Sequence, residues 1–334
     1  MKRSAKAFET VGETRIGIEE AGRLVEVHVE RASDLRRPVP GAVWTGRVRR
    51  LAPDMGGAFV DLGVAPDGFL RFTTSPGAPR LAEGMLLDVS VRREAEPGKG
   101  PILIYKAPAT HDAPRAVTRP DLRERLVARF PGLIFTPGDV PTLDELVQAE
   151  IALPGGGTIA IEPTRALVAV DVDKGANPSS RKVGEAAARV IARQLRLRGL
   201  GGLICIDFPN IRQPKPRARL EKTVAEAFAH DPDLPKIAPL SRFGVIEMTR
   251  TRATRSLDRL LRDTPLETKA IAALERLLRE GRAHPGARLR LTVCAPVMDW
   301  LNTWSHPWRT ELAERLGERF VVVDGNATAV EADR

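Results

Sequence analysis

Cysteine, tyrosine and long apolar runs are all scarce in this sequence. The 334 residues include two cysteines, Cys205 and Cys294, too few for a disulfide framework or a four-thiolate zinc site. No apolar run approaches the roughly 20 residues that span a bilayer, and residues 1–10 have no hydrophobic stretch after their basic start. We therefore expect neither a membrane protein nor a secreted precursor, and we expect a cytoplasmic location.

The residues that are present suit folded domains. Hydrophobic residues make up 43% of the chain and charged residues 28%, a balance typical of globular proteins and not of disordered ones. The length predicts two or three domains.

The positive charge of the chain is unevenly distributed. The formal net charge is +9, and between Arg181 and Lys222 eleven Lys or Arg residues face three Asp or Glu residues. Such a cluster is typical of a surface that binds a polyanion. It favours nucleic acid as the partner; the alternative is a merely solvated basic face.

The first half of the sequence has the pattern of β-strands. Residues 14–18 and 24–29 alternate around a turn in which Gly22 predicts a hairpin. Five more short strands then follow within about 65 residues, which is typical of a small closed barrel such as an OB-fold. They are expected at 43–48, 57–62, 68–72, 85–92 and 101–106, followed by a linker at 107–120 and short helices at 121–130 and 142–149.

Strand and helix patterns alternate in the second half. The helix expected at 180–198 has Ser179 or Ser180 as its cap and Gly199 at its end. Strands are expected at 158–161, 165–172, 203–208, 288–294 and 319–323, with helices at 220–230, 265–281 and around Trp300 and Trp308.

Two aspartates interrupt apolar strands near their ends. A strand–helix–strand crossover makes the strands that carry Asp171 and Asp207 parallel and adjacent, so both side chains lie at the sheet edge where sites collect. Two close carboxylates repel unless a proton or a cation lies between them, and Mg²⁺ accepts one or two carboxylates together with water and phosphate oxygens. The pattern leaves three interpretations: a metal site, carboxylates that cap or pair with arginines, and a pair that shares a proton.

Three segments of the second half resemble the ribonuclease E/G family. They are residues 195–208 (LRLRGLGGLICIDF), residues 153–161 with 168–171, and residues 241–248 (SRFGVIEM). The resemblance implies a DNase I-like catalytic subdomain that cleaves single-stranded RNA internally. It also implies that Asp171 and Asp207 are catalytic and hold Mg²⁺, with Mn²⁺ as an alternative ion.

The barrel region resembles the family's RNA-binding OB-fold at residues 46–48, 57–63 and 67–70. The resemblance implies that Phe59 and Phe69 stack on bases and that Lys99 occupies a basic position, whereas core packing is the alternative for each phenylalanine. Aromatic side chains on such a barrel contribute about 1–3 kcal/mol per stacked base. Trp44 is expected in the core.

Arginines of the catalytic region are expected to hold the RNA backbone. Arg242 and Arg250, together with the basic cluster Arg181–Lys222, are assigned this role. The tryptophans at 300, 304 and 308 are expected to pack in a core or between domains, with RNA stacking or a dimer contact as the alternative.

The sequence also departs from the family pattern. Asp173 replaces the usual Asn and is expected to act as a catalytic third ligand or to orient water. No cysteine lies between Cys205 and Cys294, so we expect no zinc and no zinc-linked oligomer. The segment between the barrel and Leu153 is too short to hold both the 5′-monophosphate-recognising domain and the part of an RNase H-like fold that the family usually carries there, so we expect weak or no preference for 5′-monophosphorylated RNA.

Together these features predict an α+β multidomain protein, with an OB-fold β-barrel, a DNase I-like α/β catalytic subdomain and a small C-terminal α/β domain. The predicted function is Mg²⁺-dependent endonucleolytic cleavage of single-stranded RNA in RNA processing or decay. A non-catalytic RNA-binding protein derived from the family is the main alternative, and a phosphoesterase for a small nucleotide is a remoter one. The boundaries are 1–40 for a hairpin segment, 41–107 for the OB-fold, 108–150 for a linker or reduced sensor region, 151–256 for the catalytic subdomain and 257–334 for a connecting helix and the C-terminal domain.

Overall fold

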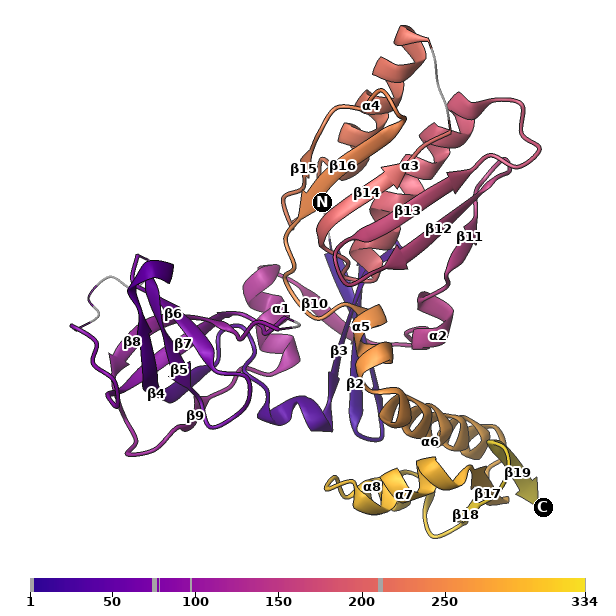
Figure 1. The fold of residues 1–334 in the computed structure, drawn as a ribbon. Helices are drawn as coiled ribbons and strands as arrows, with labels where there is room; N and C mark the ends of the chain where they lie inside the picture. Colours follow the sequence, from indigo (N-terminus) through magenta and orange to yellow (C-terminus); the bar gives the residue numbers. More distant parts are fainter. Residues whose placement is uncertain (1–2, 74–76, 78, 97, 210–212, 334) are drawn as a thin grey trace. The chain divides into compact units, whose positions relative to one another are not determined.

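The computed structural model describes residues 3–73, 77, 79–96, 98–209 and 213–333. The chain divides into two compact units (Figure 1), one formed by Ser33–Leu133 and the other by Met1–Ala32 with Ile134–Arg334. Mixed helices and sheets, with a closed barrel among them, confirm the α+β class. No helix among the described residues is long and apolar enough to cross a bilayer.

The unit Ser33–Leu133 is built around a closed five-stranded barrel. The strands follow the order β5-β6-β8-β7-β4, and β4 also pairs with β5, which closes the barrel. All five strands were predicted, because each alternates apolar and polar residues and ends at turn residues. They are β4 (Val43–Ala52), β5 (Gly57–Asp61), β6 (Gly68–Arg71), β7 (Leu86–Arg93) and β8 (Ile102–Pro108).

The interior of the barrel is apolar and contains the predicted tryptophan. Trp44 is 4% exposed and packs with Val60, Leu70 and Leu103, which confirms its core position. The linker expected at 107–120 is wrong in part, because β9 (Arg115–Thr118) adds to the edge of β4. The capping box between Asp121 and Glu124 starts the expected helix α1 (Leu122–Arg129).

A four-stranded sheet opens the second unit, in the order β10-β1-β2-β3. The predicted hairpin is confirmed as β2 (Glu13–Glu20) and β3 (Arg23–Arg31), and both residues of its turn, Ala21 and Gly22, have positive φ, as type I′ turns require. The sequence did not predict β1 (Arg3–Thr10) or β10 (Ile134–Pro137). These two strands pair in parallel, although the whole barrel lies between them in the chain.

The central sheet of this unit has the order β11-β12-β13-β14-β16-β15. As predicted, β13 and β14 are parallel neighbours joined by helix α3, whereas the other pairs are antiparallel. The strands are β11 (Glu150–Ala152), β12 (Thr158–Pro163), β13 (Val168–Asp173), β14 (Gly202–Asp207), β15 (Lys236–Ile237) and β16 (Val245–Arg250).

Two helices, α3 (Ser180–Leu197) and α4 (Pro214–Phe228), pack on one face of this sheet. The Oγ atom of Ser179 accepts the Lys182 N–H, which caps α3, and Gly199 adopts φ +65° after its last turn, so both predicted ends are confirmed. Apolar residues of both helices share one core with Val170, Val172 and Ile206 of the sheet.

The C-terminal region combines helices with the three-stranded sheet β18-β17-β19. Trp308 is buried in its core and donates its indole N–H to the Leu301 carbonyl, whereas Trp304 packs on Trp300 and against the Gly12 turn. Packing is therefore the observed role of these tryptophans. The elements of this region are α5 (Leu257–Asp263), α6 (Pro265–Ala283), β17 (Arg288–Val293), α7 (Ala295–Thr303), α8 (Trp308–Leu316), β18 (Phe320–Asp324) and the unpredicted β19 (Ala329–Asp333).

One more short helix, α2 (Leu143–Leu146), lies between β10 and β11, before the central sheet.

Candidate functional site

Asp171 and Asp207 lie directly opposite each other on the parallel strands β13 and β14, as Cα partners. Opposed residues of a ladder project from the same face of a sheet. The neighbouring Val170, Val172 and Ile206 point into the core beneath α3 and α4, whereas both aspartates are exposed. The two carboxylates therefore leave the face of the sheet that these helices do not cover, at the carboxyl ends of the strands.

The carboxylates of Asp171 and Asp207 have no protein partner within the part of the chain that the structure describes. Within the described ranges, neither Asp171 nor Asp207 forms a hydrogen bond or an ion pair, so arginine pairing and capping do not explain them there. An adjacent, solvent-facing pair of carboxylates fits the needs of Mg²⁺, which takes one or two carboxylates and keeps several waters.

Asp173 has a local role. Its Oδ1 atom accepts the Gly175 N–H at 2.8 Å, which shapes the loop between β13 and α3. No cluster of three or more His, Cys, Asp or Glu side chains suited to a metal occurs among the described residues. The structure therefore gives no support to Asp173 as a third metal ligand.

A tight loop borders Asp207. The Phe208 N–H donates to the Gly244 carbonyl at 3.2 Å, and a Cβ atom placed on Gly244 would lie 4.0 Å from the Asp207 carboxylate oxygen Oδ1. Arg242, two residues earlier, is exposed. It therefore has the access to solvent that the predicted backbone contact needs.

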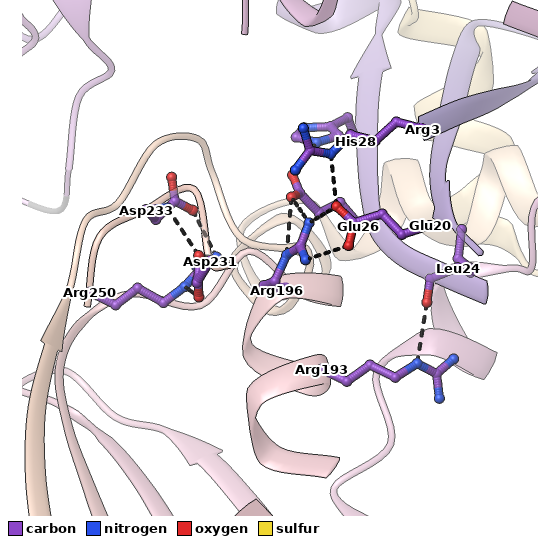
Figure 2. Close-up of polar contacts among 10 residues, drawn as sticks. All are labelled: Arg3, Glu20, Leu24, Glu26, His28, Arg193, Arg196, Asp231, Asp233 and Arg250. Atoms are coloured by element: carbon purple, nitrogen blue, oxygen red, sulfur yellow. Dashed lines mark hydrogen bonds and ion pairs between the residues drawn. The ribbon is translucent and has the colours of Figure 1, made fainter. Parts of the chain in front are cut away.

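Arg250 does not have that access, and its predicted RNA-binding role is wrong. Its side chain is 1% exposed; it donates to Asp231 and to the Leu200 carbonyl and forms an ion pair with Asp233 at 2.8 Å. Figure 2 shows the two carboxylates converging on its guanidinium. A phosphate outside the protein cannot reach an arginine side chain that is buried and held in this way.

Part of the basic cluster Arg181–Lys222 is also internal. Arg196 pairs with Glu20 and Glu26 of the β2–β3 hairpin (Figure 2), and the buried Arg198 pairs with Asp258. These two arginines therefore join α3 to neighbouring elements.

The remaining basic side chains of this cluster lie on the helix layer. Since α3 and α4 cover the face opposite to Asp171 and Asp207, only the helix starts approach the carboxyl edge of the sheet. Lys182 and Lys215 are exposed there, in the first turns of α3 and α4. Arg212 lies outside the described residues.

Burial and charge pairing shift the pKa of the Glu20 carboxyl group in opposite directions. Burial alone would raise the pKa of its carboxyl group, but hydrogen bonds and charge from Arg196 and Arg3 hold that pKa below its usual value. The carboxylate stays ionised, and it joins the hairpin to α3.

Phe59 and Phe69 are Cα partners on β5 and β6 of the barrel. Their rings meet edge to face with centroids 5.2 Å apart, and the Arg50 guanidinium lies 4.8 Å from the Phe59 centroid. Both side chains are half-buried and lie outside the apolar core of the barrel. Gly57 keeps space for this pair, because a Cβ atom there would lie 2.5 Å from the Phe69 ring.

Lys99 is exposed and lies opposite Glu96 in a short bridge. The barrel thus presents the two aromatic rings and Lys99 at its surface. No role was assigned from the sequence to Phe243, an exposed aromatic residue next to Gly244, although it lies in the segment 241–248 that resembles the family. The signal was an aromatic side chain between Arg242 and Gly244.

Comparison with known proteins finds one family. Residues 134–253 match the model of the Ribonuclease E/G family. Ribonuclease E of Escherichia coli K12 is 38% identical over 122 residues, which are 34% of this chain and 12% of that protein. The chloroplastic ribonuclease E/G-like protein of Arabidopsis thaliana is 35% identical over 124 residues, again 34% of this chain and 12% of the relative.

A longer similarity extends beyond residues 134–253. Ribonuclease G of Haemophilus influenzae is 23% identical over an alignment of 396 residues, gaps included. This alignment covers 76% of this chain and 80% of the relative. By contrast, this chain spans 12% to 18% of the length of the first ribonuclease E relatives that it matches.

Proposed function

We propose, from the similarity of this chain to the ribonuclease E/G family, that it is a Mg²⁺-dependent endoribonuclease that cleaves single-stranded RNA. The observation that carries the proposal is the register of Asp171 and Asp207, which brings together two carboxylates that have no partner among the described residues, on the face of the sheet that α3 and α4 do not cover. Similarity to the named ribonucleases supports RNA as the substrate. The proposal includes a role in RNA processing or decay in the cytoplasm, and no shared zinc.

Asp171 and Asp207 would hold the magnesium ion. A Mg²⁺ ion bound there supplies a water of lowered pKa and offsets negative charge on a phosphodiester. The protein's own contribution is to fix both carboxylates on adjacent strands of a packed sheet, so that their positions do not depend on a mobile loop. Asp173 orders the loop that follows β13 through its bond to Gly175.

Basic side chains at the same edge of the sheet would attract the RNA backbone. Lys182, Lys215 and Arg242 are exposed at the start of α3, at the start of α4 and in the loop before β16. Their charges oppose the repulsion between the phosphates and the aspartates, and their contribution falls as salt rises. In the barrel, Phe59 and Phe69 would stack unpaired bases, and Lys99 would contact the backbone.

The proposal is tested by cleavage of an unstructured, A/U-rich RNA oligonucleotide by the purified full chain. We expect internal cleavage that needs Mg²⁺ and stops with a chelator. Asp207→Asn is expected to lower the rate by more than about 100-fold, while RNA affinity stays similar or rises because less negative charge faces the phosphate.

Glu226→Gln is the matched control, because it removes one exposed carboxylate of α4, in the helix layer on the face of the sheet opposite to the aspartate pair. It is expected to cleave normally. RNA binding without any Mg²⁺-dependent cleavage, or full activity of Asp207→Asn, would overturn the proposal, and the first outcome would indicate a binding protein.

A further inference from the structure

The loop before β16 exposes an aromatic ring beside the aspartate pair. Phe243 is 76% exposed. A single exposed apolar side chain is ordinary on a protein surface, so exposure alone indicates nothing. The position of this ring, the order of its loop and its arginine neighbour together indicate a function.

The position follows from the strand register. Val245 is the Cα partner of Asp207, and a Cβ atom placed on Gly244 would lie 4.0 Å from Oδ1 of Asp207. Gly244 has φ +91°, a conformation that favours glycine. Phe243 therefore lies two residues before the strand partner of the proposed catalytic Asp207.

The loop is ordered by its own hydrogen bonds. The Ser241 Oγ atom accepts the N–H groups of Phe243 at 3.3 Å and Val245 at 3.2 Å. Arg217 of α4 donates to the carbonyl groups of Leu240 at 2.9 Å and Ser241 at 2.8 Å. These bonds fix the backbone that presents Phe243, so the ring does not need a packing partner to hold it in place.

An arginine accompanies the ring. The Arg242 guanidinium lies 4.7 Å from the Phe243 ring centroid, within the range of a cation–π contact. The loop thus offers a flat apolar surface and a positive charge side by side. A nucleotide offers the complement, a flat base joined to a phosphate, and base–aromatic stacking recurs in proteins that bind single strands.

We propose that Phe243 stacks on an unpaired base next to the phosphodiester that is cleaved, and that Arg242 contacts the adjoining phosphate. This inference rests on the proposed function, because it assigns a substrate contact at the same site. Only an unpaired base can leave its neighbours and lie flat on the ring, so the contact would also select single strands over duplexes at the cleavage point.

The test compares Phe243→Ala with Phe243→Trp in two assays. The first measures KM and kcat for cleavage of a single-stranded RNA, and the second measures binding, in chelator, to an oligonucleotide in which 2-aminopurine replaces one base. We expect Phe243→Ala to raise KM and the dissociation constant roughly 5- to 150-fold and to lose 2-aminopurine quenching at one position. Phe243→Trp should keep the wild-type KM and dissociation constant, and it should keep the quenching of 2-aminopurine.

Leu234→Ala is the control, because Leu234 is equally exposed at 77% but lies before β15; it should match the wild type. Equal losses in the Ala and Trp variants, or wild-type affinity in Phe243→Ala, would overturn the inference. So would a change of oligomeric state in Phe243→Ala with unchanged RNA binding, which would indicate a protein contact.

The two proposals fail separately. If the unchanged chain does not cleave RNA, the proposed function fails, and the chelator binding assay still decides whether Phe243 stacks a base. If the unchanged chain cleaves and Phe243→Ala behaves like it in both assays, only the stacking inference fails.

Discussion

Arg250 donates from Nε to a carboxylate oxygen of Asp231 at 2.7 Å, and each of the two side chains is 1% exposed. The same guanidinium reaches Asp233 and the Leu200 carbonyl. Arg250 therefore ties the end of β16 to the segment before β15 and to the segment before β14.

Replacing Arg250 should lower the free energy of unfolding of the protein. It should not act by weakening a surface contact with RNA. Arg250→Met leaves Asp231 and Asp233 buried without their cation, and breaking a buried pair in this way costs about 3–5 kcal/mol. Urea unfolding followed by circular dichroism measures the loss. The control Arg242→Ala changes an exposed residue and should keep wild-type stability; the prediction is wrong if the two variants are equally stable.

The aromatic pair of the barrel gives a second prediction. Phe59→Ala and Phe69→Ala should each weaken binding of a single-stranded RNA by about 1–3 kcal/mol, the range for one stacked base. Fluorescence anisotropy with a labelled oligonucleotide measures this change. Phe72→Ala is the control, since Phe72 is an exposed aromatic residue of the same barrel unit outside the pair, and a loss as large in Phe72→Ala would contradict the assignment.

The pairing of Arg196 with Glu20 predicts a stability difference that depends on pH. The pKa of Glu20 is lowered in the folded state, where hydrogen bonds from Arg196 and Arg3 outweigh the effect of burial. A carboxylate of this kind stabilises the fold above its unfolded pKa of about 4.3, and the contribution is lost as pH falls through the lower folded pKa.

Arg196→Gln should therefore cost about 2 kcal/mol at pH 7, and its difference from the wild type should shrink below about pH 4. Urea unfolding at a series of pH values measures both. Arg193→Gln is the control on the same helix, since Arg193 donates to the Leu24 carbonyl and, among the described residues, to no carboxylate. A difference that stays constant down to pH 3 would refute the role of Glu20.

The short segment between the barrel and Leu153 gives a last prediction. It contains α1, β10, α2 and β11, and it has little length for a separate domain that recognises a 5′-monophosphate. The rates of cleavage of one oligonucleotide with a 5′-phosphate and with a 5′-hydroxyl should then agree within about twofold. Much faster cleavage of the oligonucleotide with the 5′-phosphate would contradict this prediction.

Local patterns were enough for most of the secondary structure. Alternation and turn residues gave the five barrel strands, and the apolar stripe between Ser179 and Gly199 gave α3. A strand–helix–strand order permits few topologies, so the parallel pairing of β13 with β14 also followed from the sequence. The similarity to ribonucleases was visible in the same segments.

Strand pairings between segments far apart in the chain could not be predicted from the sequence. The pairing of β1 with β10 joins residues on either side of the whole barrel sequence, and β9 gains its hydrogen bonds from β4. β9 and β10 have four residues each, too few for a clear sequence pattern. Their hydrogen bonds depend on the neighbours that tertiary folding supplies.

The sequence by itself determined where most chain segments become strands and helices, and that Asp171 and Asp207 lie near the ends of neighbouring strands, because these properties depend on residues close together in the chain. Only the tertiary structure decided which charged groups face solvent. The sequence near an arginine does not tell whether its side chain meets water, as that of Arg242 in the loop before β16 does, or two buried carboxylates, as that of Arg250 at the end of β16 does. That choice depends on which distant side chains the packed sheet brings within reach.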